Sequence, residues 1–506
     1  MSSQSSQIDL AILPTPILSN ADSSKKTLVM IIVRLIYNAF FHPLSSYPGP
    51  LLWGASDVPK VVQQMKGTIH DAVLELHEKY GAVVRIAPGE LSYITAGAWK
   101  DIYGNRQGLK PMPPNPIYGI REKEFFGALG LLWLEDFDSH LRHRRVISPA
   151  FSDKSLSQQE ALITKHVDLL MLRLRERTSQ AVDMWAWFNY TTFDIIGDLT
   201  FGEPFGCLEN SQMHPWISFI FSRLNMMMYG QIIDTLGFWG KIIEAMVPRR
   251  IKDQALHHVR STKSKVDKRR SRLTGRPDFM THILSHVGKA SGISLSELYA
   301  DSQILVMAGS ETSATLLAVA VFYLLKNPVT MERLKAEVRS TFSSENEITF
   351  ATISKLLYLL AVINESLRIH PPLPAGVNRR VPKDGAVVMD RFVPAGTNLQ
   401  VPHWAAYHSR TNFKHPWAFI PERWLEGDNT FADDNKDVFQ PFSFGPRACI
   451  GRSLAYMEMR IILARLVWNF DLALRSESAK WNQQRVFLLY EKKPLMVNIL
   501  PVNGRD

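Results

Sequence analysis

The chain has 506 residues, of which 46 % are hydrophobic and 21 % are charged. This composition is that of a globular protein with a large buried core, and it excludes a disordered chain. The formal net charge is +10. A basic surplus can serve nucleic acid, an anionic membrane or an acidic protein partner. The sequence has no zinc-finger spacing, aromatic RNA-binding signature or long Lys/Arg block, so we expect no nucleic-acid partner.

The chain has two cysteines, Cys207 and Cys449, and they lie far apart in the sequence. Two cysteines cannot build a disulfide scaffold or a multi-cysteine metal cluster. This usage is typical of a reducing compartment, and it raises the question of what each thiol does.

Residues 1–26 are mostly polar and form a predicted N-terminal tail. Residues 27–41 (TLVMIIVRLIYNAFF) are mainly apolar, with Arg34 and Asn38 as interruptions. A helix of this length reaches about 22 Å, which is short of a hydrocarbon core of about 30 Å. No small-residue cleavage site follows, so the segment is not a typical signal peptide. It either spans the membrane with Arg34 snorkelling or lies in the interface, the alternative being a buried helix of the globular body.

Residues 42–50 (HPLSSYPGP) contain three prolines and one glycine. This composition cannot continue a helix, and it predicts a stiff hinge between an anchor and a body that comprises residues 51–506. The hinge favours the anchor interpretation of residues 27–41.

The body is predicted to be mainly helical from about residue 68 to residue 340, most clearly over 279–288 and 294–327. Ser294 and Glu297 form a capping box, and Pro328 ends the helix that they begin. This helix is about 50 Å long. Its middle is apolar on nearly every side, so we expect it to cross the interior of the molecule.

That long helix contains residues 308–313 (AGSETS). Gly309 costs about 1 kcal/mol relative to alanine, and Glu311 costs more in an apolar interior unless it is paired. Residues that are this unfavourable in a buried helix indicate a functional site. The alternative is that Glu311 faces solvent on an amphipathic turn.

A second predicted helix covers residues 352–370, in which Glu365 and Arg368 share a face. Such pairs are common and alone indicate no function. Residues 377–401 contain short apolar runs between Gly and Pro turns, which predict short strands. The fold class expected is therefore mainly α with small β-sheets.

The strongest signal is the segment 442–451 (FSFGPRACIG). The apolar residues after it fall on one helical face, so Cys449 is predicted to lie at the N-terminal end of a helix. The helix dipole and Arg447 would stabilise a thiolate there. A single shielded thiolate suits an axial haem ligand, because it pushes electron density onto the iron.

Three other roles for Cys449 remain open. It could be a hydrolytic nucleophile, which needs a partner base. It could be a redox sensor, for which Cys207 is the available resolving thiol. It could also be a plain buried thiol, although such a thiol does not need a loop rich in Gly and Arg. Cys207 has the surroundings of a plain thiol.

Three motifs together resemble the cytochrome P-450 superfamily over about residues 42–500. The pattern Phe-x-x-Gly-x-Arg-x-Cys-x-Gly is met at Phe442, Gly445, Arg447, Cys449 and Gly451. The Glu-x-x-Arg pair of the family is met by Glu365 and Arg368, with Arg423 as its third partner. The oxygen-activation motif of the family is met by residues 308–312.

The resemblance implies a cytochrome P-450 fold that holds haem b between the long central helix and the Cys-loop helix. Cys449 would be the axial iron ligand, Phe442 would pack beside the thiolate, and Glu365, Arg368 and Arg423 would form a structural triad. Cations must meet the haem propionates. By resemblance these are Arg447, Arg379 and Arg144, with His140 at a position where many relatives carry Trp. The alternative for residues 140–145 is a solvated basic face.

The resemblance also implies a monooxygenase that inserts one atom of O₂ into an organic substrate. Thr312 would hold a water or an oxygen-derived group beside Gly309, and Glu311 would relay protons to it. Electrons would come from NADPH through a separate reductase, because the chain shows no dinucleotide-binding fingerprint. The expected location is the endoplasmic reticulum membrane, with the catalytic domain in the cytosol.

The expected substrate is a lipophilic small molecule. The Met-rich stretch Met213–Met246 can form an adaptable apolar roof over a pocket, or it can be ordinary helix core or a membrane contact. The other candidate pocket segments are mostly apolar, and they are residues 110–130, 373–377 and 486–489. Residues 41–50 and 194–199 resemble those of fungal members that oxidise secondary metabolites, so terpenoids, alkaloids and polyketides are all candidates.

Two other functions are compatible with parts of the pattern. One is a haem-thiolate isomerase or dehydratase that needs no reductase, against which the intact Glu311–Thr312 pair counts. The other is a non-catalytic haem sensor or carrier. A sensor needs neither a membrane anchor nor an oxygen-activation motif.

Overall fold

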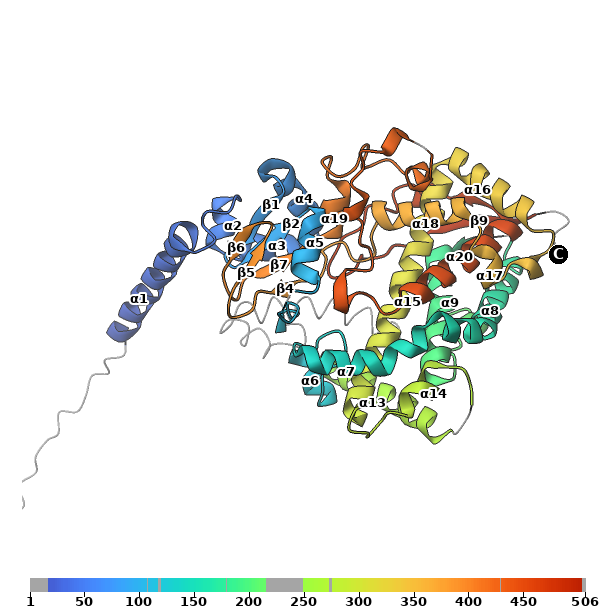
Figure 1. Ribbon diagram of the computed structural model, residues 1–506, viewed down its shortest axis with the longest axis horizontal. Helices are drawn as coiled ribbons and strands as arrows, with labels where there is room; N and C mark the ends of the chain where they lie inside the picture. Colours follow the sequence, from blue (N-terminus) through green and yellow to red (C-terminus); the bar gives the residue numbers. More distant parts are fainter. Residues whose placement is uncertain are drawn as a thin grey trace, which may run out of the picture.

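A long helix runs through the middle of a mainly helical body (Figure 1). The computed structural model describes residues 17–106, 108–116, 120–178, 180–214, 249–272, 275–427 and 429–502. Most of these residues are helical, and the strands form small sheets. The expected fold class, mainly α with small β-sheets, is confirmed.

The central helix α15 (Leu295–Lys326) is bounded as the sequence predicts. The Ser294 side chain accepts a hydrogen bond from the Glu297 N–H, and the Glu297 carboxylate accepts one from the Ser294 N–H. Helix α9 (Met184–Phe201) packs along it. A Cβ on Gly309 would lie 2.8 Å from the Ile196 side chain, so glycine at this position lets the two helices approach closely.

Some of the other regular helices pack against this pair, and others lie with small sheets on the side of the body that faces the N-terminal helix (Figure 1). In chain order they are α2 (Leu51–Ala55), α3 (Val58–Lys66), α4 (Ile69–Tyr80), α5 (Ala96–Tyr103), α6 (Ile120–Phe126), α7 (Phe137–Ile147), α8 (Asp153–Arg175), α10 (Cys207–Asn210), α13 (Arg249–Ser271), α14 (Phe279–Leu284), α16 (Pro328–Thr341), α17 (Phe350–Ile353), α18 (Leu357–Ile369), α19 (His403–His408) and α20 (Arg452–Asn469).

The largest sheet has the order β1-β2-β7-β4, in which β2 and β7 are parallel and the other pairs are antiparallel. A second sheet has the order β3-β9-β8, and β5 and β6 form a hairpin. The bounds are β1 (Val83–Ala87), β2 (Glu90–Tyr93), β3 (Ala181–Asp183), β4 (Arg379–Arg380), β5 (Ala386–Val388), β6 (Arg391–Val393), β7 (Asn398–Gln400), β8 (Phe470–Leu474) and β9 (Met496–Pro501).

The described part of the span 68–340 is mainly helical as expected, and it also contains the short strands β1, β2 and β3. Two other expectations about elements need correction. The predicted helix over residues 352–370 is two helices, α17 and α18, with a break at residues 354–356. Helix α14 is shorter than the predicted segment 279–288. The strands predicted within residues 377–401 are confirmed as β4 to β7.

Two hydrophobic cores hold the body together. The larger core lies around α15, α9, α18 and α20, and the smaller one lies between the largest sheet and the helices α4, α5 and α19. The proline-rich segment 42–50 packs against the smaller core, because Leu44 is fully buried and Tyr47 is 6 % exposed. The segment that connects the N-terminal helix to the body is thus fixed to the body.

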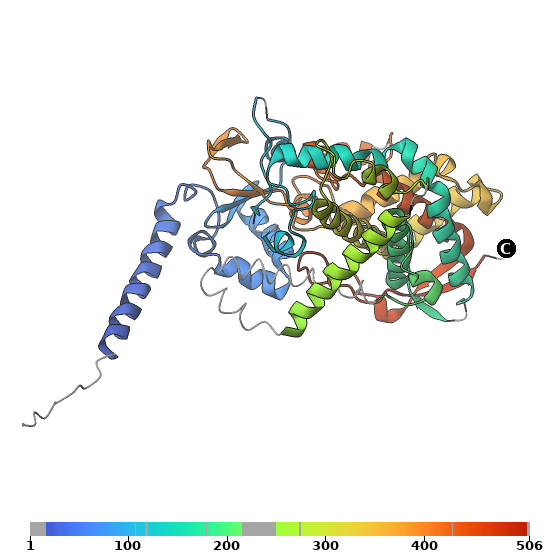
Figure 2. The same ribbon diagram turned by 90° about the horizontal axis from the view of Figure 1, so that it is seen from below.

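Helix α1 (Ile17–Ile36) stands away from the body and continues into a π-helical turn, Tyr37–Phe41 (Figure 2). It begins at Ile17, within the segment that we expected to be a polar tail. Its apolar side chains are turned to solvent: Met30 is 64 % exposed and Phe41 is 71 % exposed. Among the described residues, α15 is the helix long and apolar enough to cross a membrane, and because 78 % of its most apolar stretch is buried we assign it to the core.

Candidate active site

The Cys449 loop is held against two parts of the fold. The Cys449 N–H donates to the Phe442 carbonyl over 2.8 Å, which closes the loop just before α20 begins at Arg452. Gly445 has a φ of +74°, and a Cβ there would lie 2.1 Å from the Tyr103 carbonyl oxygen at the end of α5. Only glycine fits this close approach. The Phe442 ring packs on Tyr456 of α20, with 5.2 Å between centroids.

The Cys449 thiol is accessible to solvent, although it is enclosed enough that burial dominates its pKa. Burial raises the pKa above its ordinary value, and the Gly451 N–H and the Arg144 charge offset part of that rise. The N–H at the start of α20 and an arginine thus favour the thiolate as expected, but the arginine is Arg144 rather than Arg447 and burial outweighs both. A thiol in such a place ionises readily when a metal cation replaces the proton, so the donor fits a metal-bound thiolate.

Three arginines, Arg144, Arg379 and Arg447, act on one buried histidine beside this loop. Burial and then the charges of these arginines lower the pKa of His140 to about 3, so it is neutral. Arg144 donates to the Ala448 carbonyl over 2.7 Å. Arg447 donates to the Leu134 carbonyl over 2.7 Å. Arg144 and Arg447 are thus fixed in place by backbone oxygens.

No Asp or Glu forms an ion pair with Arg144, Arg379 or Arg447 in the part of the chain that the structure describes. Arg379 is 5 % exposed, and burial lowers its pKa. Its guanidinium lies 5.2 Å from the centroid of the Tyr103 ring. The Nε of Arg447 is buried without a hydrogen-bond acceptor among the described residues. Buried cations without anions predict an anionic ligand, and two haem propionates fit this cluster.

Helix α7 carries His140 and Arg144 and is fixed to the start of α15. Arg142 pairs with Glu297 over 2.7 Å, and His143 pairs with Asp301 over 2.8 Å. Within residues 140–145 the exposed side chain is that of Arg145. The alternative of a solvated basic face is therefore wrong.

Glu311 is buried in the middle of α15, where it is 1 % exposed. Burial raises its pKa, and a buried ion pair with Lys492 offsets part of the rise. The alternative in which Glu311 faces solvent is wrong. The Thr312 hydroxyl donates to the Ala308 carbonyl over 2.7 Å, so its oxygen still has lone pairs that can accept a hydrogen bond.

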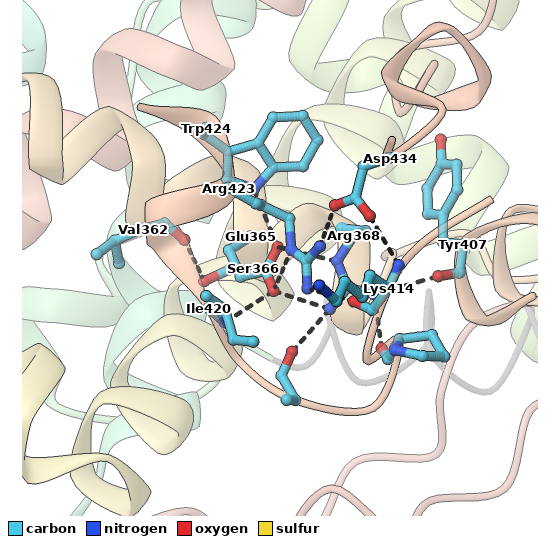
Figure 3. Close-up of polar contacts among 12 residues, drawn as sticks. Val362, Glu365, Ser366, Arg368, Tyr407, Lys414, Ile420, Arg423, Trp424 and Asp434 are labelled. Carbon is cyan, nitrogen blue, oxygen red and sulfur yellow. Dashed lines mark hydrogen bonds and ion pairs between the residues drawn. The ribbon is translucent and has the colours of Figure 1, made fainter. Parts of the chain in front are cut away.

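The Glu365–Arg368 pair lies at the centre of a dry polar cluster (Figure 3). Arg368 binds both carboxylate oxygens of Glu365 at 2.8 and 2.9 Å and three backbone carbonyls. Arg423 binds the same carboxylate and pairs with Asp434. All four side chains are fully buried. Every charge here has a partner, which is the arrangement of a structural element.

Sequence reasoning missed several members of these sites. Asp434 and Trp424 complete the polar cluster: Trp424 donates to Glu365 over 2.9 Å. Lys492, the partner of Glu311, lies 181 positions away in sequence. No local pattern indicates these contacts, because each joins segments that the fold alone brings together.

The other roles considered for Cys449 lack support. The groups that act on its thiol are the Gly451 N–H and Arg144, and neither is a general base. Burial raises the pKa of Cys207 to about 12, which makes it a poor resolving thiol. No group of three or more His, Cys, Asp or Glu side chains that could hold a metal ion occurs among the described residues. The Met-rich stretch Met213–Met246 lies mostly outside the described residues.

The sequence matches the Cytochrome P450 family over residues 44–499. The chain belongs to the cytochrome P450 family. It is 44 % identical to the cytochrome P450 monooxygenase astA of Talaromyces wortmannii, over 94 % of this chain and 96 % of that protein. It is 41 % identical to the cytochrome P450 monooxygenase astJ of Aspergillus oryzae, over 93 % and 94 % of the two chains. It is also 40 % identical to the averantin hydroxylase of Dothistroma septosporum, over 94 % and 90 %.

These matches span nearly the whole of each protein, so the chain is a cytochrome P450 monooxygenase. Membership implies a haem-thiolate centre, the use of O₂ and a reductase as electron donor. The resemblance predicted from the three motifs is thus confirmed.

Proposed function

We propose that Cys449 is the axial thiolate of a haem b whose propionates are bound by Arg144, Arg379 and Arg447. The observation that carries the proposal is the cluster of arginines without carboxylate partners around neutral His140, next to the Cys449 loop. When bound, the haem supplies oxygen activation. The protein supplies the ligand, the charges that hold the group, and an interior that excludes water.

Glu311 and Thr312 serve proton delivery in this proposal. Glu311 has one carboxylate oxygen paired with Lys492 and a second, buried oxygen without a hydrogen-bond partner among the described residues. That second oxygen can accept a proton and pass it on, which is the work of a general acid and base. Thr312 follows directly on the same helix, and its oxygen can accept the proton-bearing hydrogen bond. Gly309 keeps this turn of α15 close to α9.

The reaction proposed is hydroxylation or a related oxidation of a lipophilic secondary metabolite. It uses O₂ and NADPH-derived electrons. The relatives named above support this class, and one of them is an averantin hydroxylase. The segments 373–377 and 486–489 are the proposed apolar lining. An isomerase or dehydratase would not need Glu311 on the central helix.

We further propose that residues 27–41 anchor the protein to the endoplasmic reticulum membrane, with the catalytic body in the cytosol beside its reductase. The exposed apolar side chains of α1 and of the π-helical turn that follows support this, since water does not favour such a surface. The Arg85 guanidinium donates to the Asn38 carbonyl over 2.9 Å, which fixes the base of the helix to the body.

The test is turnover in microsomes that contain the full-length chain and a fungal NADPH reductase, supplied with extracts of lipophilic fungal metabolites. We expect product formation that requires both NADPH and O₂, and label from isotopic O₂ in the product. Product that forms without reductase would favour an isomerase or dehydratase. A protein that binds haem and converts none of the compounds would favour a sensor.

A further inference from the structure

Lys492 joins the last hairpin of the chain to the middle of the central helix. The hairpin comprises residues 485–491, and its strands are bridged between Val486 and Tyr490. The Glu491 N–H donates to the Arg485 carbonyl over 2.7 Å, and the side chains of these two residues form an ion pair of 2.7 Å. Val486 and Tyr490 belong to the smaller core, while Leu488 and Leu489 pack against the larger one. The hairpin therefore sits between the two cores.

Directly after this hairpin, the Lys492 ammonium forms an ion pair with Oε1 of Glu311. The two side chains are 2 % and 1 % exposed. The ammonium also donates to the Tyr490 carbonyl over 3.3 Å, and it lies 5.7 Å from the centroid of the Tyr490 ring. A lysine is rarely this buried unless it is paired, so its position depends on Glu311 as much as that of Glu311 depends on it.

The two carboxylate oxygens of Glu311 have different surroundings. Oε1 faces Lys492 and, at 3.3 Å, the Thr315 hydroxyl of the next turn. Oε2 is buried without a hydrogen-bond partner among the described residues. An ionised carboxylate with one oxygen held and one oxygen open can accept a proton at the open oxygen without losing its place. Burial raises the pKa of Glu311, and the ammonium offsets part of that rise, so it favours the ionised form of the carboxylate.

The titratable and polar groups that face Glu311 and Lys492 come from three elements. Lys492 comes from the end of the hairpin and Thr315 from α15 itself. From the end of α18, His370 stacks on the Tyr490 ring with 4.0 Å between centroids. Burial lowers the pKa of His370, and the Lys492 charge lowers it further, so His370 is neutral beside the pair. Lys492 is thus the cation that favours the ionised form of Glu311 against the effect of burial.

We propose that Lys492 is the positioning residue for Glu311. The 485–491 hairpin, which Lys492 directly follows, thereby takes part in proton delivery. The inference rests on the proposed role of Glu311 as the proton-relaying group. Lys492 holds Oε1 and keeps the carboxylate ionised, so that Oε2 takes up a proton and hands it on toward Thr312. The proton passes through the Glu311 carboxylate, and the net charge of the pair changes by the one proton in transit.

The test compares Lys492→Gln, Lys492→Arg and the control Lys493→Gln, whose lysine is exposed and adjacent. Each holoenzyme is combined with a fungal NADPH reductase, without added substrate, and O₂ consumption after addition of NADPH is measured with an oxygen electrode across neutral and alkaline pH. For Lys492→Gln we expect a rate about tenfold lower at neutral pH that recovers on the alkaline side. Without the ammonium, the buried Glu311 ionises only at higher pH.

Lys492→Arg keeps a cation at this place, so we expect its pH profile to stay near that of the parent. Lys493→Gln should match the parent at every pH. A rate for Lys492→Gln that falls equally at all pH values would overturn the proposal. A lysine that only supports the fold would not change the pH at which the rate of O₂ consumption rises.

A second measurement reports on the pair without turnover. In a double-mutant cycle of thermal unfolding with Glu311→Gln, we expect Lys492→Gln alone to lower the melting temperature and the double variant to recover most of the loss. Additive losses would mean that the two groups are not paired. A parent that lacks the red-shifted CO band of a haem-thiolate centre would refute the proposed function itself. If parent and variants all show the red-shifted CO band and Lys492→Gln has the pH dependence of the parent, only the role of Lys492 would be refuted.

Discussion

Two clusters of buried arginines in this molecule differ in which groups compensate their positive charge. Around Glu365, each of the guanidiniums of Arg368 and Arg423 has a buried carboxylate (Figure 3). Around His140, the three guanidiniums have no Asp or Glu ion-pair partner among the described residues. The first cluster is complete within the protein. The second cluster is complete only with an anion from outside.

On our proposal, the difference separates structural arginines from arginines that bind the haem propionates. Removing one partner from a paired buried cluster leaves an uncompensated charge in the folded protein, which lowers the free energy of unfolding. Removing Arg379 from the cluster around His140 relieves repulsion between cations, so we expect the stability of the fold to be kept and the proposed haem binding to weaken. Burial alone does not distinguish the two, because Arg368 and Arg379 are both buried.

The largest effect is expected for Arg368→Ala. It leaves Glu365 with one guanidinium fewer and three backbone carbonyls without their donor. We expect a loss of about 3–5 kcal/mol in the free energy of unfolding and little soluble protein. The control is Arg333→Ala, because Arg333 is half exposed and its pair with Glu422 contributes at most about 1 kcal/mol. Chemical denaturation compares the two, and equal losses would contradict the distinction.

Glu458 is the reverse case, a buried carboxyl with no cation. Burial raises its pKa to about 8, and the Ser313 hydroxyl offsets part of that rise. The unfolded chain loses this proton above the ordinary pKa of 4.5, whereas the folded chain keeps it until about pH 8. Stability therefore falls as pH rises through this window.

The variant Glu458→Gln should remove that dependence and raise the free energy of unfolding by about 3 kcal/mol near neutral pH. Denaturant titrations of parent and variant, at mildly acidic and at neutral pH, measure the difference. If both proteins lose the same stability between the two pH values, Glu458 is ionised in the fold and our assignment is wrong.

A smaller effect is expected for Arg379→Gln. It removes a charge-assisted hydrogen bond that is worth about 1.5–3 kcal/mol to haem, so haem affinity falls by roughly ten- to a hundredfold. The unfolding of the haem-free protein should not change. Arg380→Gln is the matched control, since Arg380 is the exposed neighbour on the same strand. The readout is the rate of haem loss to an excess of a haem-binding protein. Equal rates for the two variants would count against the propionate site.

Much of this site could be predicted from the sequence because its signals are local. The loop 442–451 and the capping box at Ser294 each span no more than ten residues. The spacing of residues within each one determines the turn or the start of the helix. The pairing of Glu365 with Arg368 is also local, because i and i+3 share a helix face.

Contacts between distant segments could not be predicted in this way. Asp434 and Lys492 are ordinary charged residues in the sequence, and the fold alone brings them to Arg423 and Glu311. The break between α17 and α18 was missed because the apolar pattern continues across it. The start of α1 at Ile17 was missed because Ser, Asn and Asp residues weaken the helical pattern there.

The central claim is that Cys449 is the haem ligand, and the reduced-CO spectrum tests it most directly. The full-length chain is compared with Cys449→Ala and with Cys207→Ala, which removes the buried thiol of α10. We predict a strongly red-shifted Soret band for the parent and for Cys207→Ala, and its loss in Cys449→Ala. A band that survives in Cys449→Ala, or a parent band typical of histidine ligation, would contradict the account.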